Sequence, residues 1–296
     1  MNDTSKAYLM LIITTACWAG NVILGKLAVG EITPMQLVSA RWFGVSLLLL
    51  VFARKYIVTD WPVIRKHLWF VLLMGMSGFT AFNALYYLAA HSTSAINIGI
   101  LQGSIPVFVL LASYLIFRFK SSPLQLLGVS LTLLGVIIVA SGGDFDKLRQ
   151  LNLNIGDLFM LTACILYAAY SLGLSRRPPA SALGLFTAMA CVAFLVSLPL
   201  LAIESYQQGM TMPTTKGWII VGLVTLLPSF LAQVLFIRSV ELIGPARAGV
   251  FINLIPVFAS VMAVYYLQEP LQSFQMVSLL MVLGGIGLSE LGKKTI

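Results

Sequence analysis

Long apolar stretches alternate with short polar breaks along the whole chain, and the alternation gives ten such stretches. A helix needs about 20 mostly apolar residues to cross a bilayer. Pro34 and Pro123 stand where helices would begin, and Gly142-Gly143 stands where one would end. The pattern predicts an all-α integral membrane protein with ten transmembrane helices, at residues 7–25, 34–53, 68–89, 94–117, 123–141, 156–174, 181–203, 217–240, 246–268 and 271–290.

The breaks between these stretches are too short to hold a soluble domain. The longest, 54–67 and 142–155, are interpreted as loops. The three cysteines, Cys17, Cys164 and Cys191, all lie inside apolar stretches, so their placement fits neither a disulfide framework nor a zinc site. With no phosphate-binding loop or nucleophile motif in the chain, we expect no metal, no cofactor and no enzymatic activity.

Composition supports the membrane interpretation. Charged residues make up only 9% of the chain and apolar residues 59%, whereas a soluble domain has about 25% charged residues. The net charge of +8 comes from basic residues that occur singly or in pairs between apolar stretches. This is not the basic face of a nucleic-acid-binding protein. The expected partners are therefore the lipid bilayer and a small molecule, with no nucleic acid, and the sequence leaves a homodimer open.

The basic residues also alternate between successive breaks. Four fall on one side of the predicted membrane, namely Lys26, Lys147, Arg149 and Lys216. Since basic residues are retained on the cytoplasmic side, we expect both termini there and the protein in the plasma membrane, the inner membrane of a bacterium. Thirteen fall on that cytoplasmic side: Lys6, Arg54, Lys55, Arg65, Lys66, Arg118, Lys120, Arg176, Arg177, Arg238, Arg247, Lys293 and Lys294.

An internal repeat divides the chain into two halves, 1–145 and 146–296. The sequence Ile-Pro-Val-Phe occurs at 105–108 and again at 255–258, displaced by 150 residues, and further identical pairs share this offset: Gly99 with Gly249, Gln125 with Gln275, and Gly135 with Gly285. The offset spans five predicted helices, an odd number, so the second half enters the membrane from the opposite side. Two inverted five-helix repeats, with a binding site between them, are the architecture of many secondary transporters.

The sequence resembles the EamA-type transporters of the drug/metabolite transporter superfamily. The resemblance spans the chain and rests on the order of several motifs: Trp18, Arg41, Pro106, Pro256, Glu269-Pro270 and Gly284-Gly285. It implies ten helices in a five-plus-five duplication and export or exchange of small metabolites. The first half departs from it, because Phe119-Lys120 stands where the second half has Glu269-Pro270.

Arg41 is the most informative single residue. It lies about seven residues into its predicted helix, roughly 10 Å below the surface at 1.5 Å per residue. An unpaired charge at that depth is costly. One interpretation is a structural anchor that snorkels outward or binds a helix-end carbonyl. The other is a cavity-facing guanidinium that attracts a substrate carboxylate or phosphate.

Other polar and aromatic side chains lie at comparable depth. Taken singly, each is explained as well by packing or by hydrogen bonds between helices. Together with Arg41 they predict a substrate cavity, with the candidate binding residues Trp18, Asn21, Asn83, Tyr86, Gln102, Tyr167, Tyr170, Gln233 and Asn253.

Pro106 and Pro256 are candidate hinges, because proline in mid-helix removes a backbone hydrogen bond. Gly99 and Gly103 have the spacing of a close helix contact. No Asp or Glu lies deep in an apolar stretch, which favours facilitated export or exchange at least as much as proton coupling. We expect a secondary transporter for a small polar metabolite, an amino acid or related compound, working by alternating access. A membrane-embedded receptor or enzyme is the alternative.

Overall fold

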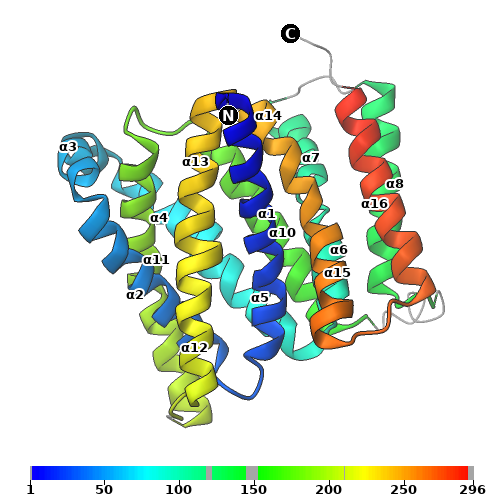
Figure 1. Ribbon diagram of the computed structural model, residues 1–296, viewed down its shortest axis with the longest axis horizontal. Helices are drawn as coiled ribbons and strands as arrows, with labels where there is room; N and C mark the ends of the chain where they lie inside the picture. Colours follow the sequence, from blue (N-terminus) through cyan, green and yellow to red (C-terminus); the bar gives the residue numbers. More distant parts are fainter. Residues whose placement is uncertain (1, 118–121, 145–152, 210, 293–296) are drawn as a thin grey trace.

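The computed structural model describes residues 2–117, 122–144, 153–209 and 211–292. Over these ranges the chain forms helices and no strand. Figure 1 shows most helices running roughly side by side, with the start of the chain and the end of α16 at the same end of the bundle. We call this the terminal end, and the opposite end, where α1 stops and α16 starts, the far end.

The first half contains α1 (Asp3–Leu27), α2 (Pro34–Phe52), α3 (Arg54–Ile64), η1 (Arg65–His67), α4 (Leu68–Gly75), η2 (Met76–Ala81), α5 (Phe82–Ser92), α6 (Ala95–Gln102), α7 (Ile105–Phe117) and α8 (Pro123–Ala140). The second half contains α10 (Ile155–Leu174), α11 (Ala182–Gln208), α12 (Thr215–Val224), η3 (Thr225–Leu231), α13 (Ala232–Ile243), α14 (Pro245–Val250), η4 (Phe251–Leu254), α15 (Ile255–Leu267) and α16 (Ser273–Leu291). In the described part of the chain these join into ten helical stretches long and apolar enough to span a membrane, which confirms the predicted class.

Two of the predicted helix starts carry complete capping boxes. At α2, Gln36 N donates to Thr33 Oγ1 over 3.4 Å, and Thr33 N donates back to the Gln36 side chain. At α8, Ser122 and Gln125 form the same pair of bonds. Each box satisfies two backbone donors that a helix start leaves unpaired, and the proline that follows has no N–H to satisfy.

The segment 54–67 is not the loop expected from the sequence. Most of it forms α3, which Figure 1 shows almost end-on and therefore crossing the spanning helices. Its less exposed residues Ile57, Asp60, Val63 and Ile64 recur every three or four positions, so one face packs on the bundle and the other is exposed, as in a helix that lies at a membrane surface. The Asp60 carboxylate on α3 accepts the Ser181 N–H over 2.9 Å, at the start of α11.

Four spanning stretches are interrupted at matching places in the two halves. The π-helical segment η2 lies inside the third stretch, and η3 lies inside the eighth, 150 residues later. The fourth stretch breaks between α6 and α7, and the ninth has the 3-10 segment η4 before α15. Pro106 and Pro256 thus stand at the second residue of α7 and of α15, not in mid-helix as the sequence suggested. There the missing N–H costs little.

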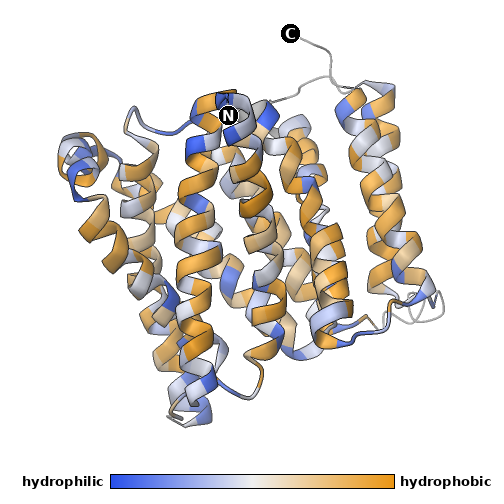
Figure 2. Ribbon diagram, in the orientation of Figure 1, coloured by the Kyte–Doolittle hydropathy of each residue, from blue (hydrophilic) through white to orange (hydrophobic). Residues whose placement is uncertain are grey.

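The outside of the bundle is apolar, as a lipid-facing surface requires. Figure 2 shows hydrophobic residues along the middle of the helices and polar residues mainly at the two ends. Inside, small residues let helices approach closely. A Cβ added at Gly128 would lie 2.7 Å from the Ser289 backbone nitrogen, so α8 and α16 pack backbone to backbone.

Polar side chains join the two halves at the far end. Glu31, in the loop after α1, accepts hydrogen bonds from Thr214 Oγ1 at 2.5 Å and from Lys216 Nζ at 3.0 Å. These two donors lower the pKa of the Glu31 carboxyl below its usual value, because both stabilise the charged form. Glu204, buried at the end of α11, accepts the Met35 N–H at the start of α2 over 3.1 Å.

Candidate functional site

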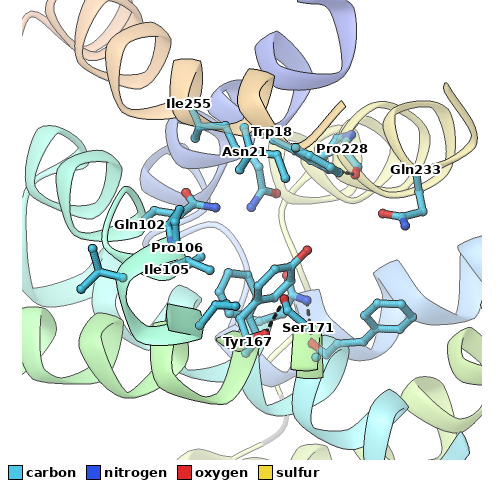
Figure 3. Close-up of a pocket in the computed structure, with 18 of the residues that line it drawn as sticks. Trp18, Asn21, Gln102, Ile105, Pro106, Tyr167, Ser171, Pro228, Gln233 and Ile255 are labelled. Atoms are coloured by element: carbon cyan, nitrogen blue, oxygen red, sulfur yellow. Dashed lines mark hydrogen bonds between the residues drawn. The ribbon is translucent and has the colours of Figure 1, made fainter. Parts of the chain in front are cut away.

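A cavity of about 420 Å³ lies between the two halves. Figure 3 shows side chains from α1, α6, α10 and α13 converging on it. Eight of the twelve candidate residues line it: Trp18, Asn21, Arg41, Asn83, Gln102, Pro106, Tyr167 and Gln233. The volume falls within the range of small-molecule sites in proteins.

Arg41 lies on α2 and is only 6% exposed. Its Nη1 donates to Asn21 Oδ1 at 3.2 Å, to Asn83 Oδ1 at 2.7 Å and to the Tyr87 hydroxyl at 2.6 Å. The Tyr87 hydroxyl donates in turn to Asn21 Oδ1 at 3.1 Å. Arg41 therefore neither snorkels outward nor binds a helix-end carbonyl, because neutral side chains of α1 and α5 hold it inside the bundle.

The other edge of the guanidinium carries the Nε and Nη2 donors. All three hydrogen bonds use Nη1, and the buried Nε meets no acceptor in the described part of the chain. Nε and Nη2 form a planar pair of parallel N–H donors, which matches the two oxygens of a carboxylate. An anionic group bound at this edge would leave the three Nη1 bonds in place.

The π segments shape this region. A π turn is wider than an α turn and leaves a backbone carbonyl available to side chains. Asn83 Nδ2 donates to the Phe79 carbonyl of η2 at 2.6 Å, which orients its Oδ1 toward Arg41. Trp18 on α1 is fixed by the other half, because its Nε1 donates to the Pro228 carbonyl of η3 at 3.0 Å, as Figure 3 shows. Both π segments therefore fix a side chain that lines the cavity.

Aromatic rings form one wall of the cavity. Trp42 stacks on Phe79 with ring centroids 4.5 Å apart, and Phe79 meets Phe186 edge to face at 5.8 Å. Phe82 lies against Tyr167 at 5.0 Å. All five rings line the cavity. This wall can hold an apolar body or a cationic group of a ligand.

Four candidate residues do not line the cavity. Tyr86 and Tyr170 are buried in the packed core of the first half and α10, and Tyr170 packs against Phe79. Asn253 lies partly buried in η4, and Pro256 is buried at the start of α15, where its neighbour Ile255 reaches the cavity. For Tyr86, Tyr170 and Asn253 the proposed contact with substrate has no support in the geometry, whereas Pro256 was expected only as a hinge.

Several residues that line the cavity were not predicted from the sequence. Trp42, Phe79 and Phe186 are aromatic residues in apolar stretches, where nothing in the pattern separates a cavity face from a packing face. Gln125 and Glu290 lie near helix ends, and only the Gln125–Gln275 repeat pair hinted at the first. Tyr87, the third partner of Arg41, was also missed, because nothing in the sequence separates it from the adjacent Tyr86.

Three buried polar atoms of cavity residues make no hydrogen bond within the described residues. They are the donors Arg41 Nε and Trp42 Nε1 and the acceptor Gln102 Oε1. Buried polar atoms without partners are rare in folded proteins, and each needs an explanation. A ligand with both acceptor and donor groups would pair them.

The described residues include no group of three or more His, Cys, Asp or Glu side chains placed to bind a metal ion. Cys17, Cys164 and Cys191 are free thiols. The polar groups that line the cavity are amides, hydroxyls, two indole N–H groups, the Arg41 guanidinium and the Glu290 carboxylate.

A helical membrane protein with two inverted five-helix halves around one polar cavity has the architecture of a secondary transporter. The model of the EamA-like transporter family matches this chain twice, at residues 5–141 and 154–290. The chain belongs to this family and is a multi-pass membrane transporter.

The similar proteins are also named as transporters. The "Uncharacterized transporter YetK" of Bacillus subtilis is 26% identical over 97% of this chain and 88% of its own length. The "Uncharacterized inner membrane transporter YedA" of Escherichia coli is 23% identical over 93% and 88% of the two chains. A solved crystal structure, 17% identical and covering 98% of this chain and 99% of its own, superposes with a TM-score of 0.65, which shows a shared fold.

Proposed function

We propose that the protein exchanges or exports a small metabolite bearing a carboxylate, an amino acid or a related compound, by alternating access through the central cavity. The observation that carries the proposal is the Nε edge of Arg41, a buried donor with no partner in the described residues beside a cavity of about 420 Å³. The substrate carboxylate would bind the Nε and Nη2 edge of the guanidinium.

The rest of the cavity fits the rest of such a substrate. The unpaired Gln102 Oε1 can accept a hydrogen bond from an ammonium or amide donor. The ring faces of Phe79 and Phe82 offer an apolar surface to a side chain or a cation–π contact to an ammonium group. The inverted halves supply two related packings, one open to each side of the membrane. The plasma membrane, with both termini cytoplasmic, remains the expected location.

Counterflow in proteoliposomes tests this proposal. Vesicles preloaded with one unlabelled amino acid at a time are assayed for uptake of the same radiolabelled compound. For each compound that exchanges, unlabelled compound added outside should compete with the labelled uptake. Its carboxamide analogue should compete much more weakly, because an amide presents one acceptor oxygen and no charge to Arg41. Equal competition by acid and carboxamide would remove the carboxylate from the proposal. A panel with no exchange at all would reject this substrate class.

A further inference from the structure

The cavity reaches only one end of the bundle. Its lining runs from Asn21 and Gln102 in the middle to Gln125 at the start of α8 and Ser289 at the end of α16. These last two belong to the terminal end. The residues around the cavity include none from the far-end loops of the described chain. The structure is therefore the state with access from the terminal end.

The matching glycines Gly99 and Gly249 show this asymmetry directly. A Cβ added at Gly99 would lie 2.7 Å from Ala259 Cβ, so α6 presses against α15 at the far end. A Cβ added at Gly249 would meet nothing within 4 Å, and Gly249 lines the cavity. The same position of the repeat is therefore a closed helix contact in one half and an open surface in the other.

The second half binds the closed end of α6 through Glu269 and Gln275. Ala95 N donates to Glu269 Oε1 at 2.9 Å, and Ile96 N donates to Oε2 at 3.1 Å. Gln275 Nε2 donates to Asn97 Oδ1 at 2.7 Å. A carboxylate that accepts two backbone N–H groups at a helix start makes strong, charge-assisted bonds and also interacts favourably with the helix dipole.

The repeat does not provide these bonds at the terminal end. At the offset of 150 residues, Glu269 corresponds to Phe119 and Asn97 to Arg247. Phe119 lies outside the described residues, but its side chain has no acceptor. A phenylalanine cannot bond the start of α14 as Glu269 bonds the start of α6.

Two other carboxylates at helix starts are matched between the two ends. Glu204 accepts the Met35 N–H at the start of α2, and Asp60 accepts the Ser181 N–H at the start of α11. The start of α2 belongs to the far end and the start of α11 to the terminal end. These two bonds balance each other between the ends, whereas the Glu269 bonds have no counterpart in the sequence.

We propose that Glu269 is a one-sided latch, a positioning residue that holds α6 against α15 and makes the far-end-closed state the resting state of the empty carrier. The proposal rests on the alternating access proposed above. Opening the far end requires release of both N–H bonds to Glu269. At the terminal end the counterpart Phe119 offers no carboxylate for such bonds, so the empty protein rests open toward its termini.

Two reporter cysteines at equivalent positions test the latch. Ser113 lines the cavity, and its counterpart Ala263 is fully buried at the far end. In detergent and without substrate, a water-soluble maleimide should label Ser113→Cys quickly and Ala263→Cys slowly. Adding Glu269→Gln should speed labelling at position 263 about tenfold, a population change worth about 1.4 kcal/mol. Labelling at each cysteine is read by peptide mass spectrometry.

Glu241→Gln is the matched control, since it makes the same chemical change in an exposed ion pair with Arg238 inside α13, which does not join the two halves. It should leave labelling at position 263 unchanged. Equal acceleration by Glu241→Gln and Glu269→Gln would overturn the latch, as would no acceleration by Glu269→Gln. If the Glu269→Gln variant does not purify in a folded form, amide hydrogen exchange on the wild-type protein tests the latch instead. The Ala95 and Ile96 amides should be protected without substrate, and fast exchange at both would reject the latch.

The result separates the latch from the transport proposal. Labelling is measured without substrate, so an unchanged rate at position 263 in a variant that still exchanges substrate rejects the latch alone. A wild-type protein that exchanges no carboxylate compound rejects the proposed function whatever the labelling shows.

Discussion

Arg41 has structural hydrogen bonds on one edge of its guanidinium and a proposed binding role on the other. A buried charge is destabilising unless hydrogen bonds replace its lost hydration. Asn21, Asn83 and Tyr87 supply three such bonds on one edge. The opposite edge, with its unpaired Nε, is where we propose that the substrate carboxylate binds. Structural anchoring and substrate binding, which were alternatives for the sequence, are compatible in the structure.

Substitution of Arg41 separates its charge from its geometry. Arg41→Lys keeps the charge but loses the planar pair of donors, so it should fold and transport weakly. Arg41→Gln removes a costly buried charge and should insert normally, yet lose transport. Counterflow at matched expression measures both. Full transport by Arg41→Gln would contradict a binding role, and unfolding of both variants would leave Arg41 as an anchor only.

Tyr87→Phe tests the support of the guanidinium. The variant loses the 2.6 Å bond to Arg41 and the bond to Asn21 while keeping the ring. A hydrogen bond to a charged group contributes about 1.5–3 kcal/mol. The melting temperature in detergent should therefore fall, and the half-saturation concentration of substrate should rise. Tyr265→Phe, at a 71% exposed position, should change neither. A Tyr87→Phe protein with wild-type values of both would show that Asn21 and Asn83 suffice.

The sequence identified the polar part of the cavity better than its aromatic part. Asn21, Asn83 and Gln102 stand out because amides are rare in apolar stretches. Tyr86 and Tyr87 are adjacent on one helix and look equivalent in the sequence, yet only Tyr87 bonds Arg41. Successive residues on a helix point about 100° apart, and the wider π turn in η2 changes which of them faces inward. That rotation cannot be read from hydropathy.

At the level of elements, the ten apolar stretches were predictable, but their internal breaks were not. Hydropathy depends on side chains, whereas the change from α to π or 3-10 geometry is a change of backbone hydrogen bonds. The sequence therefore placed Pro106 and Pro256 in mid-helix, although each stands at a helix start. It also missed α3, which is too short and too polar to span a membrane.

The pair Gly284 and Gly285 tests the packing of α8 against α16. A Cβ at Gly285 would lie 2.5 Å from the Gly128 carbonyl oxygen, whereas one at Gly284 would meet only Leu131 at 3.6 Å. Overpacking of this kind costs about 1–3 kcal/mol. Gly285→Ala should lower the melting temperature, and Gly284→Ala should leave it near the wild-type value. Equal melting temperatures for both variants would show that the helices separate without cost.

For the whole molecule, the inverted duplication was the most predictable property. An offset of 150 residues across five helices requires inversion, and the family model matches both halves. The division at residues 145 and 146 falls within 145–152, outside the described residues, and stays a prediction. Which end was closed could not be predicted, because the repeat makes the two ends similar and a few side chains decide between them.

Topology is testable on the intact protein. The distribution of basic residues predicts that a cysteine at Lys6 and another at Lys293 are both labelled from the cytoplasmic side. Lys6 lies near the start of α1, and Lys293 lies outside the described residues. Intact cells treated with an impermeant maleimide should label neither position, and permeabilised cells should label both. Labelling of either one in intact cells would refute the predicted orientation.

The π segments η2 and η3 bear on the history of the gene. A π turn holds more residues than an α turn, and such turns are rare. Finding one at the same offset in both halves is explained most simply by one ancestral insertion that was copied when the gene doubled. The ancestor then encoded a five-helix chain that already had its π turn. Because the cavity takes residues from both halves, that shorter protein would have enclosed it by pairing with a second molecule inserted upside down.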